Sequence, residues 1–234
     1  PNEYLAKILN SQERNSLMGT LDDEGYIQGG QASFIPDAWG FDGSMFIDLT
    51  LTEFGEKNKD DIISMVFNYL NVMSENGVTL AHFNELKATN NIAYDNYTTL
   101  PPLQAALSLT NRIFELEPLH LIEYEYVTED FDAQLILNVL NQMKPENVRI
   151  YHIGPNEEIN TQLQFADGGY RVEQIQASDF TNWEKSKYAL VIPAAELIED
   201  DETTSFKALT DYKTPQKVYS SDGVQAYLSH TQNF

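Results

Sequence analysis

Few side chains in this 234-residue chain could carry metal or nucleophilic chemistry. His82 and Glu85 match half of a zinc-peptidase helix, but the second histidine would fall at Leu86. The other histidines have no partner at ligand spacing: His120, His152 and His230. A Ser/His/Asp triad is not excluded by composition, although no segment has the form of a nucleophile elbow. We therefore expect His82 and Glu85 to form a solvent-facing pair on a helix.

Composition and charge narrow the class of protein. The chain has no cysteine, which excludes thiol catalysis, disulfides and cysteine-ligated metals and leaves the compartment, periplasm or cytoplasm, undecided. The 14 Lys and Arg against 36 Asp and Glu give a net charge of −22. Such a surface repels phosphate backbones, so we expect no nucleic-acid partner. It could attract basic peptides, but a merely solvated acidic surface is the commoner meaning of such a charge.

Length and hydropathy favour a folded chain outside the membrane. The hydrophobic share of 42% is ordinary for a globular protein. No run approaches the roughly 18 apolar residues of a membrane span, so we expect no membrane partner. Because the sequence begins at Pro1 without an apolar leader, we expect a soluble piece of a larger protein.

The elements that must position the candidate groups follow from periodicity and capping. Apolar spacing predicts helices over 1–9 and 16–24, the second capped by Ser16 and ended by Gly25. Strands are predicted over 26–34 and 44–51. Thr52 can then cap a helix, and a long amphipathic helix is expected over 59–76.

The second half of the chain predicts more helices than strands. Helices are expected over 79–94, 101–113, 132–143 and 180–187, and strands over 148–153 and 170–175. A linker-like stretch over 189–214 leads to a hairpin over 218–228. The helix over 79–94 should face inward through Leu80, Phe83 and Leu86. One buried cluster is expected under the sheet: Phe67, Leu70, Leu107, Leu135, Val139 and Ile150.

This order indicates the α+β class, because the helices cluster between strands instead of alternating with them. We expect a two-layer sandwich in which helices back a mostly antiparallel sheet. Several segments, in order along the chain, resemble the pitrilysin and insulin-degrading-enzyme (insulinase) family of zinc metallopeptidases. They are residues 3–9, 16–26, 46–55, 132–153, 170–173 and 188–193, including the corner Leu51-Thr-x-x-Gly55.

The resemblance implies a metallopeptidase-like fold of the LuxS and processing-peptidase type. Residues 1–180 would be the family's second, inactive domain, and 181–234 a linker and the truncated start of the third. In the family's first domain a His-x-x-Glu-His helix binds zinc. Here Glu3 and Lys7 stand in for the ligands and Ala6 for the general base. Protonated Lys7 offers no lone pair, so we expect no metal site and no catalytic residue here, with zinc only in the parent's catalytic domain.

The pair Gly29-Gly30 lacks the flanking lysine and the strand-to-helix context of a phosphate loop. Its small residues leave a strand edge open, and the family anchors substrate peptides by adding them to an edge strand of this domain. The resemblance therefore implies these substrate-binding residues: Ala6, Lys7, Asn10, Gln28, Gly29, Gly30 and Gln31. A glycine-containing bend without a binding role is the competing interpretation.

The expected function is a non-catalytic, substrate-chamber portion of a zinc-dependent metalloendopeptidase. Its partners would be peptide substrates and other domains of the same parent chain. Two alternatives stay open. One is a structural, non-peptidase homologue of the core-subunit or processing-peptidase type, which a missing zinc motif upstream would favour. The other is an unrelated acidic binding module, which the lack of a four-to-six-stranded sheet would favour.

Overall fold

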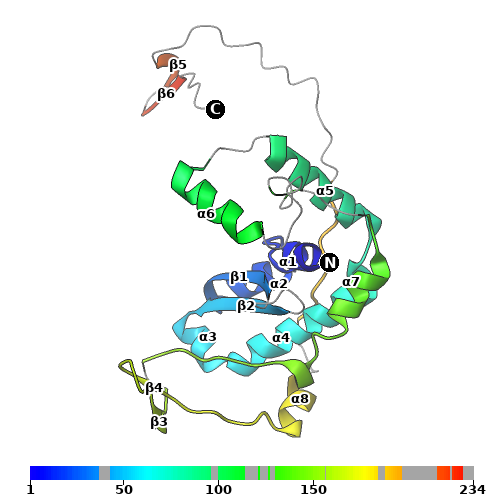
Figure 1. The fold of residues 1–234 in the computed structure, drawn as a ribbon, viewed down its shortest axis with the longest axis vertical. Coiled ribbons are helices and arrows are strands. Elements are labelled where there is room, and N and C mark those ends of the chain that lie inside the picture. Colours follow the sequence, from blue (N-terminus) through cyan, green and yellow to red (C-terminus); the bar gives the residue numbers. More distant parts are fainter. Residues whose placement is uncertain are drawn as a thin grey trace. The chain divides into compact units, whose positions relative to one another are not determined.

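The computed structural model describes residues 1–36, 43–95, 100–113, 121, 126, 130–155, 157–183, 188–196, 215–221 and 223–228. Two compact units divide the chain, residues 1–86 with 129–196 and residues 87–128 with 197–234. The described helices are α1 (Asn2–Leu9), α2 (Leu17–Asp23), α3 (Glu53–Lys57), α4 (Lys59–Val72), α5 (Leu80–Asp95), α6 (Pro102–Arg112), α7 (Ala133–Leu140) and α8 (Ala177–Trp183). Figure 1 shows them with the strands β1 (Ile27–Pro36), β2 (Gly43–Leu51), β3 (Thr161–Gln162), β4 (Gly169–Tyr170), β5 (Gln216–Ser221) and β6 (Val224–Leu228).

The strands pair in antiparallel twos, β1 with β2, β3 with β4 and β5 with β6. In the first pair Ala32 lies opposite Ile47, and a bulge between Ile27 and Gly29 interrupts the register. The predicted α+β class and the closing hairpin are confirmed. Among the described residues, however, no sheet is wider than two strands, so the larger antiparallel sheet that we expected does not form there.

The corner after β2 brings the start of α3 against the residue that precedes β1. The Thr52 N–H donates to the Tyr26 carbonyl at 3.0 Å. The Thr52 hydroxyl donates to the Gly25 carbonyl at 2.7 Å and accepts from the Gly55 N–H at 3.0 Å, which makes it the predicted helix cap. A β-carbon on Gly55 would lie 2.0 Å from the Tyr26 oxygen. Only glycine fits this approach.

The first unit builds its core from the helices next to this corner. As predicted, α1 buries Tyr4, Leu5, Ile8 and Leu9, and Ser16 caps α2 through the Gly19 N–H. The apolar residues that are exposed by 1% or less come from three helices and the turn after α4: Leu5, Leu9, Leu17, Met18, Leu21, Met65, Tyr69 and Met73. The core therefore joins α1 and α2 to α4 in one cluster.

A π-helical turn over Met73–Gly77 extends α4 and meets the Tyr4 hydroxyl. That hydroxyl donates to the Gly77 carbonyl at 2.5 Å and accepts from the Thr79 N–H at 2.9 Å. Burial raises the pKa of Tyr4, so the hydroxyl keeps its proton at neutral pH. One side chain thus satisfies the polar groups where the helix ends.

Three of the predicted core residues are not buried. Leu135 is 47% exposed, Leu107 is 58% exposed and lies in the other unit, and Leu80 is 54% exposed. The side chains of α7 itself are apolar on most sides of the helix, so periodicity alone does not identify its inner face. Ile136 and Leu140, one turn apart, face inward, and Leu135 lies about 100° away from Ile136 around the helix.

Two predicted strands are also shorter or absent. Residues 148–153 form no ladder with another described strand, and the strand expected over 170–175 is reduced to β4. Of the six residues expected in one cluster, Phe67 and Leu70 are buried, whereas Val139 and Ile150 are partly buried against it.

Of the helices in the described residues, none combines the length and apolar character that a membrane crossing needs. Residues 37–42, between the first two strands, and most of the linker-like stretch over 189–214 lie outside the described residues, as do His120 and His230.

Replacing Gly55 with alanine is expected to destabilise the first unit, because its β-carbon would have to push the Tyr26 carbonyl away. We expect a loss of about 1–3 kcal/mol, the range for overpacking, in urea-induced unfolding. Gly29→Ala is the matched control, since a β-carbon at Gly29 would meet no atom within 4 Å. The control should change stability by about 1 kcal/mol or less. Equal losses in both variants would show that the corner is not tightly packed.

A pair of alanine substitutions tests which face of α7 is buried. Ile136 is 3% exposed and its neighbour Leu135 is 47% exposed. Ile136→Ala should cost roughly 2–5 kcal/mol of unfolding free energy. Leu135→Ala should cost about 1 kcal/mol or less. A larger loss for Leu135→Ala than for Ile136→Ala would reverse the assignment.

Candidate functional site

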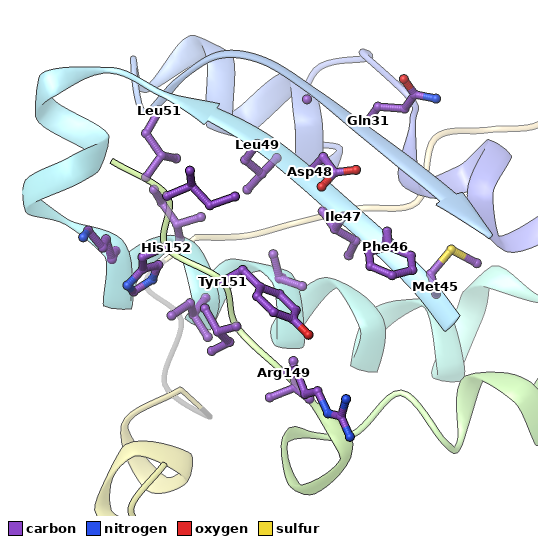
Figure 2. A pocket seen from close by; sticks show the side chains of 18 of the residues that line it. Gln31, Met45, Phe46, Ile47, Asp48, Leu49, Leu51, Arg149, Tyr151 and His152 are labelled. Carbon is purple, nitrogen blue, oxygen red and sulfur yellow. The ribbon is translucent and has the colours of Figure 1, made fainter. Parts of the chain in front are cut away.

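A groove of about 1580 Å³ lies beside β2 in the first unit. Figure 2 shows Ile47, Leu49 and Leu51 along one side and Arg149, Tyr151 and His152 along the other. Apolar side chains of α4 line it as well: Ile62, Ile63, Val66, Phe67 and Leu70. Three of the predicted binding residues line the same groove: Gly29, Gly30 and Gln31.

The glycine pair lies in β1, as predicted, and the two glycines face different surroundings. Gly29 is exposed, and a β-carbon there would meet no atom within 4 Å. A β-carbon on Gly30 would lie 2.7 Å from Leu49 Cδ2 and 3.0 Å from Met18 Sδ. Gln28 and Gln31 are exposed. Among the described residues β1 pairs with β2 alone.

Asn10 occupies part of the other edge of β1. Its carboxamide nitrogen donates to the Ala32 carbonyl at 2.8 Å, and its carboxamide oxygen accepts from the Ala32 N–H at 2.6 Å. The side chain thus makes the two hydrogen bonds that a neighbouring strand would make at Ala32. The sequence placed Asn10 beside the site but gave no sign of this pairing, because an asparagine just after a helix more often caps the helix itself.

Ala6 and Lys7 lie on α1, which packs against β1, and both are partly buried. The Lys7 ammonium lies 2.9 Å from a carboxylate oxygen of Glu85. The other oxygen of Glu85 accepts from the backbone N–H of Glu196 at 3.2 Å. The Lys7 charge is therefore engaged by a side chain on α5.

His82 is held by hydrogen bonds at both ring nitrogens. Nε2 lies 2.8 Å from the Pro193 carbonyl, and Nδ1 lies 2.8 Å from the Thr79 hydroxyl. A carbonyl oxygen only accepts, so Nε2 carries a proton and donates it to Pro193. The expectation of a solvent-facing pair is therefore wrong. Both His82 and Glu85 tie α5 to the segment 188–196.

These contacts do not fit a zinc site. At the positions that correspond to the zinc motif, Glu3 is exposed, Ala6 has no donor atom and Lys7 is paired with Glu85. Within the described residues no three His, Cys, Asp or Glu side chains come together in a group that could hold a metal. We assign no metal chemistry to this surface.

One end of the groove carries a three-residue ion cluster. Lys59 Nζ lies 2.7 Å from Glu56 Oε1 and 3.0 Å from Glu157 Oε1. The hydrogen bond with Glu56 raises the pKa of Lys59, and the hydrogen bond from Lys59 lowers the pKa of Glu157. The contribution of Glu157 to stability is therefore present above the ordinary carboxyl pKa and is lost as the pH falls through the lowered value.

Comparison with known proteins gives a consistent result. Residues 59–234 match the family model described as the middle or third domain of peptidase M16. Protease 3 of Escherichia coli (strain K12) is 24% identical over 234 residues, which cover 99% of this chain and 24% of that protein. Insulin-degrading enzyme-like 2 of Arabidopsis thaliana is 23% identical over 192 residues, 80% of this chain and 19% of that protein.

A crystal structure of pitrilysin has the same fold, with a TM-score of 0.80 and 23% identity over 99% of this chain and 25% of that one. The chain thus spans about a quarter of the length of the relatives that it matches. Because the family model covers most of the chain, the unrelated acidic module is excluded although the described sheets are narrow. The chain belongs to the peptidase M16 family, the insulinase family of pitrilysin and the insulin-degrading enzymes.

Proposed function

We propose that these 234 residues form a non-catalytic part of the substrate chamber of a larger, zinc-dependent metalloendopeptidase. The family match over most of the chain carries the proposal. It is supported by the short share of each relative that the chain covers, and by the lack of a His-x-x-Glu-His motif in the sequence. Zinc and the catalytic residues would then belong to another domain of the parent protein.

The domain division follows from the same proposal. Residues 1–180 would be an inactive peptidase-like domain, and 181–234 would link it to the beginning of the next homologous domain. Two hydrogen bonds support a linker that is anchored to the first domain at its start: His82 donates to the Pro193 carbonyl, and Glu85 accepts from the Glu196 N–H.

We further propose that β1 anchors substrate peptides by strand addition. The support is geometric: β1 has only β2 as a partner among the described strands, and Gly29 leaves the surface above it open. Asn10 already pairs with Ala32, so added peptide would pair near Gly30, next to that closed position. Gln28 and Gln31 would flank the peptide, with Ala6 and Lys7 behind it on α1.

A structural, non-peptidase role is the rival proposal. The relatives that match are named as proteases and insulin-degrading enzymes, which does not favour it. The sequence upstream of Pro1 in the parent protein decides between the two: a zinc motif there supports the peptidase, and its absence supports the structural role.

The first functional prediction concerns metal. The 234 residues, purified without chelator, should contain far less than one zinc per chain and should hydrolyse no peptide. The reason is that Glu3, Ala6 and Lys7 replace the motif and that both His82 nitrogens are already hydrogen-bonded. Elemental analysis is the measurement. A stoichiometric zinc that disappears in His82→Ala would contradict the prediction.

The second functional prediction concerns the β1 edge. Ala32 directs its N–H and carbonyl away from β2, and by the strand period Gly30 does the same. Gly30→Pro should therefore weaken the binding of an extended basic peptide by removing a donor. Gly30→Ala is the matched control, because it adds a β-carbon in the same place and keeps the N–H.

Titration of the labelled chain with basic and acidic peptides, followed by NMR, measures both effects. Basic peptides should bind more tightly because the net charge is −22. Affinity should be weak, since ordering a free peptide on one wall is costly. Shifts that cluster away from Gln28–Gln31, or equal losses in the two Gly30 variants, would rule out the anchoring role.

A further inference from the structure

We infer that the groove beside β2 holds an extended strand of the parent protein from outside these 234 residues, which pairs with β2 on one side and with residues 149–153 on the other. The inference rests on the proposed function only in requiring a longer parent chain. It concerns the backbone edge of β2, whereas the proposed peptide anchor uses the backbone edge of β1, although Gly29, Gly30 and Gln31 also line the groove.

The parity of hydrogen bonding shows which groups β2 directs into the groove. Ala32 gives both backbone groups to Asn10, so Ala32 and Ile47 are a pair that makes no hydrogen bonds to each other. Independently, the Thr52 N–H donates to the Tyr26 carbonyl, so the backbone N–H and carbonyl groups of Thr52 and of every second residue before it point toward β1. Both observations direct the N–H and carbonyl groups of four residues away from β1: Met45, Ile47, Leu49 and Leu51.

Those backbone groups lack partners in the part of the chain that the structure describes. Backbone donors and acceptors in folded proteins are almost always paired, and an open strand edge is a template for another strand. The edge is also long: seven residues from Met45 to Leu51 span roughly 24 Å at 3.4 Å per residue.

The opposite side of the groove is a second strand without a ladder. The burial of residues 148–151 alternates: Val148 and Ile150 are partly buried and Arg149 and Tyr151 exposed. This two-residue period is that of a half-buried strand. Beyond the Val148 N–H, which donates to Pro145, no backbone hydrogen bond of the segment to a described residue is seen. Tyr151 and Ile153, 69% and 97% exposed, are apolar groups left in water.

The apolar floor of the groove favours a permanent occupant over an exchanging one. It is formed by Ile62, Ile63, Val66, Phe67 and Leu70 of α4, and Ile63 and Val66 remain partly exposed. The volume of about 1580 Å³ exceeds the roughly 300–1,000 Å³ of small-molecule pockets. A floor this apolar is typical of obligate contacts, whereas sites for exchanging partners are more polar.

The occupant is therefore an extended segment with alternating apolar residues, which would face α4 while its backbone pairs on both sides. The parent protein is the natural source, since the relatives are about four times as long as this chain. A second copy is disfavoured because two chains of charge −22 repel each other. A substrate peptide is disfavoured because the floor would then be exposed to water between turnovers.

Hydrogen exchange at single-residue resolution tests the inference on unmodified protein. In the 234 residues alone, the amides of Ile47, Leu49 and Tyr151 should exchange rapidly. In the intact parent they should exchange roughly 100-fold more slowly or slower still. The Asp48 and Thr50 amides, which face β1, are the internal control and should be protected in both proteins.

Each other outcome overturns the inference in a recognisable way. Protection of Ile47 and Leu49 that appears only with added substrate peptide would make the groove a substrate site. Protection that grows with the concentration of the 234 residues would make it a contact between copies. Rapid exchange in the intact parent would mean that nothing pairs there. If the protein isolated from its native source had a mass of only 26.6 kDa, there would be no longer parent chain. That result would contradict the proposed function as well as this inference.

A matched pair of variants gives a second readout. Ile63→Lys places a charge on the groove floor, whereas Asn71→Lys places one on an exposed position of the same helix. Ile63→Lys should lower the melting temperature of the intact parent by more than it lowers that of the 234 residues alone. Asn71→Lys should change both proteins equally and little. The same small shift from both variants in the parent would contradict a buried floor.

Discussion

The close approach of Gly55 to the Tyr26 carbonyl is the contact on which the first unit depends. It requires a residue without a β-carbon, and it places the N–H of Thr52 on the same carbonyl. The contact continues the β1–β2 pairing beyond the last strand residues and turns the chain directly into α3 and α4. A single corner thus fixes the register of the two strands and the direction of the longest buried helix.

The β1–β2 sheet that ends at this corner has two dissimilar edges. At the β1 edge, Asn10 supplies a side chain in place of a strand and leaves the glycine pair beside it. At the β2 edge, backbone groups without a partner among the described residues lie beside an apolar groove floor. Gln28 and Gln31 are exposed at the first edge, which fits the exchanging peptide that we propose there, whereas the apolar floor at the second edge fits a permanent partner.

Local chemistry could be predicted where it is decided by near neighbours. Ser16 and Thr52 cap helices, Gly25 takes a φ of 72°, and α1 buries the expected stripe, because each depends on a few adjacent residues. The prediction that Leu135 is buried was wrong because α7 is apolar on most sides. The Asn10–Ala32 pairing joins residues 22 positions apart, and nothing in the sequence near either one encodes it.

The segment 148–153 shows a different limit. Its alternating pattern did predict a strand, and the partly buried Val148 and Ile150 show the expected period. A ladder, however, needs a neighbour, and a pattern within one segment says nothing of whether that neighbour is present. The candidate site has the same character: the glycines were found from their small size, but the roles that we propose for the two edges depend on which backbone groups are already paired.

The pairing of Asn10 with Ala32 depends on a side chain that can be chemically altered with time. The Asn10 carboxamide donates to the Ala32 carbonyl and accepts from its N–H at once, and Asn10 is followed by the small residue Ser11. Hydrolysis of that amide would leave a carboxylate, which accepts but cannot donate and would face the Ala32 oxygen with like polarity. Slow deamidation, visible as a more acidic form on ion exchange, would thus expose Ala32, the position of the β1 edge that the Asn10 side chain covers.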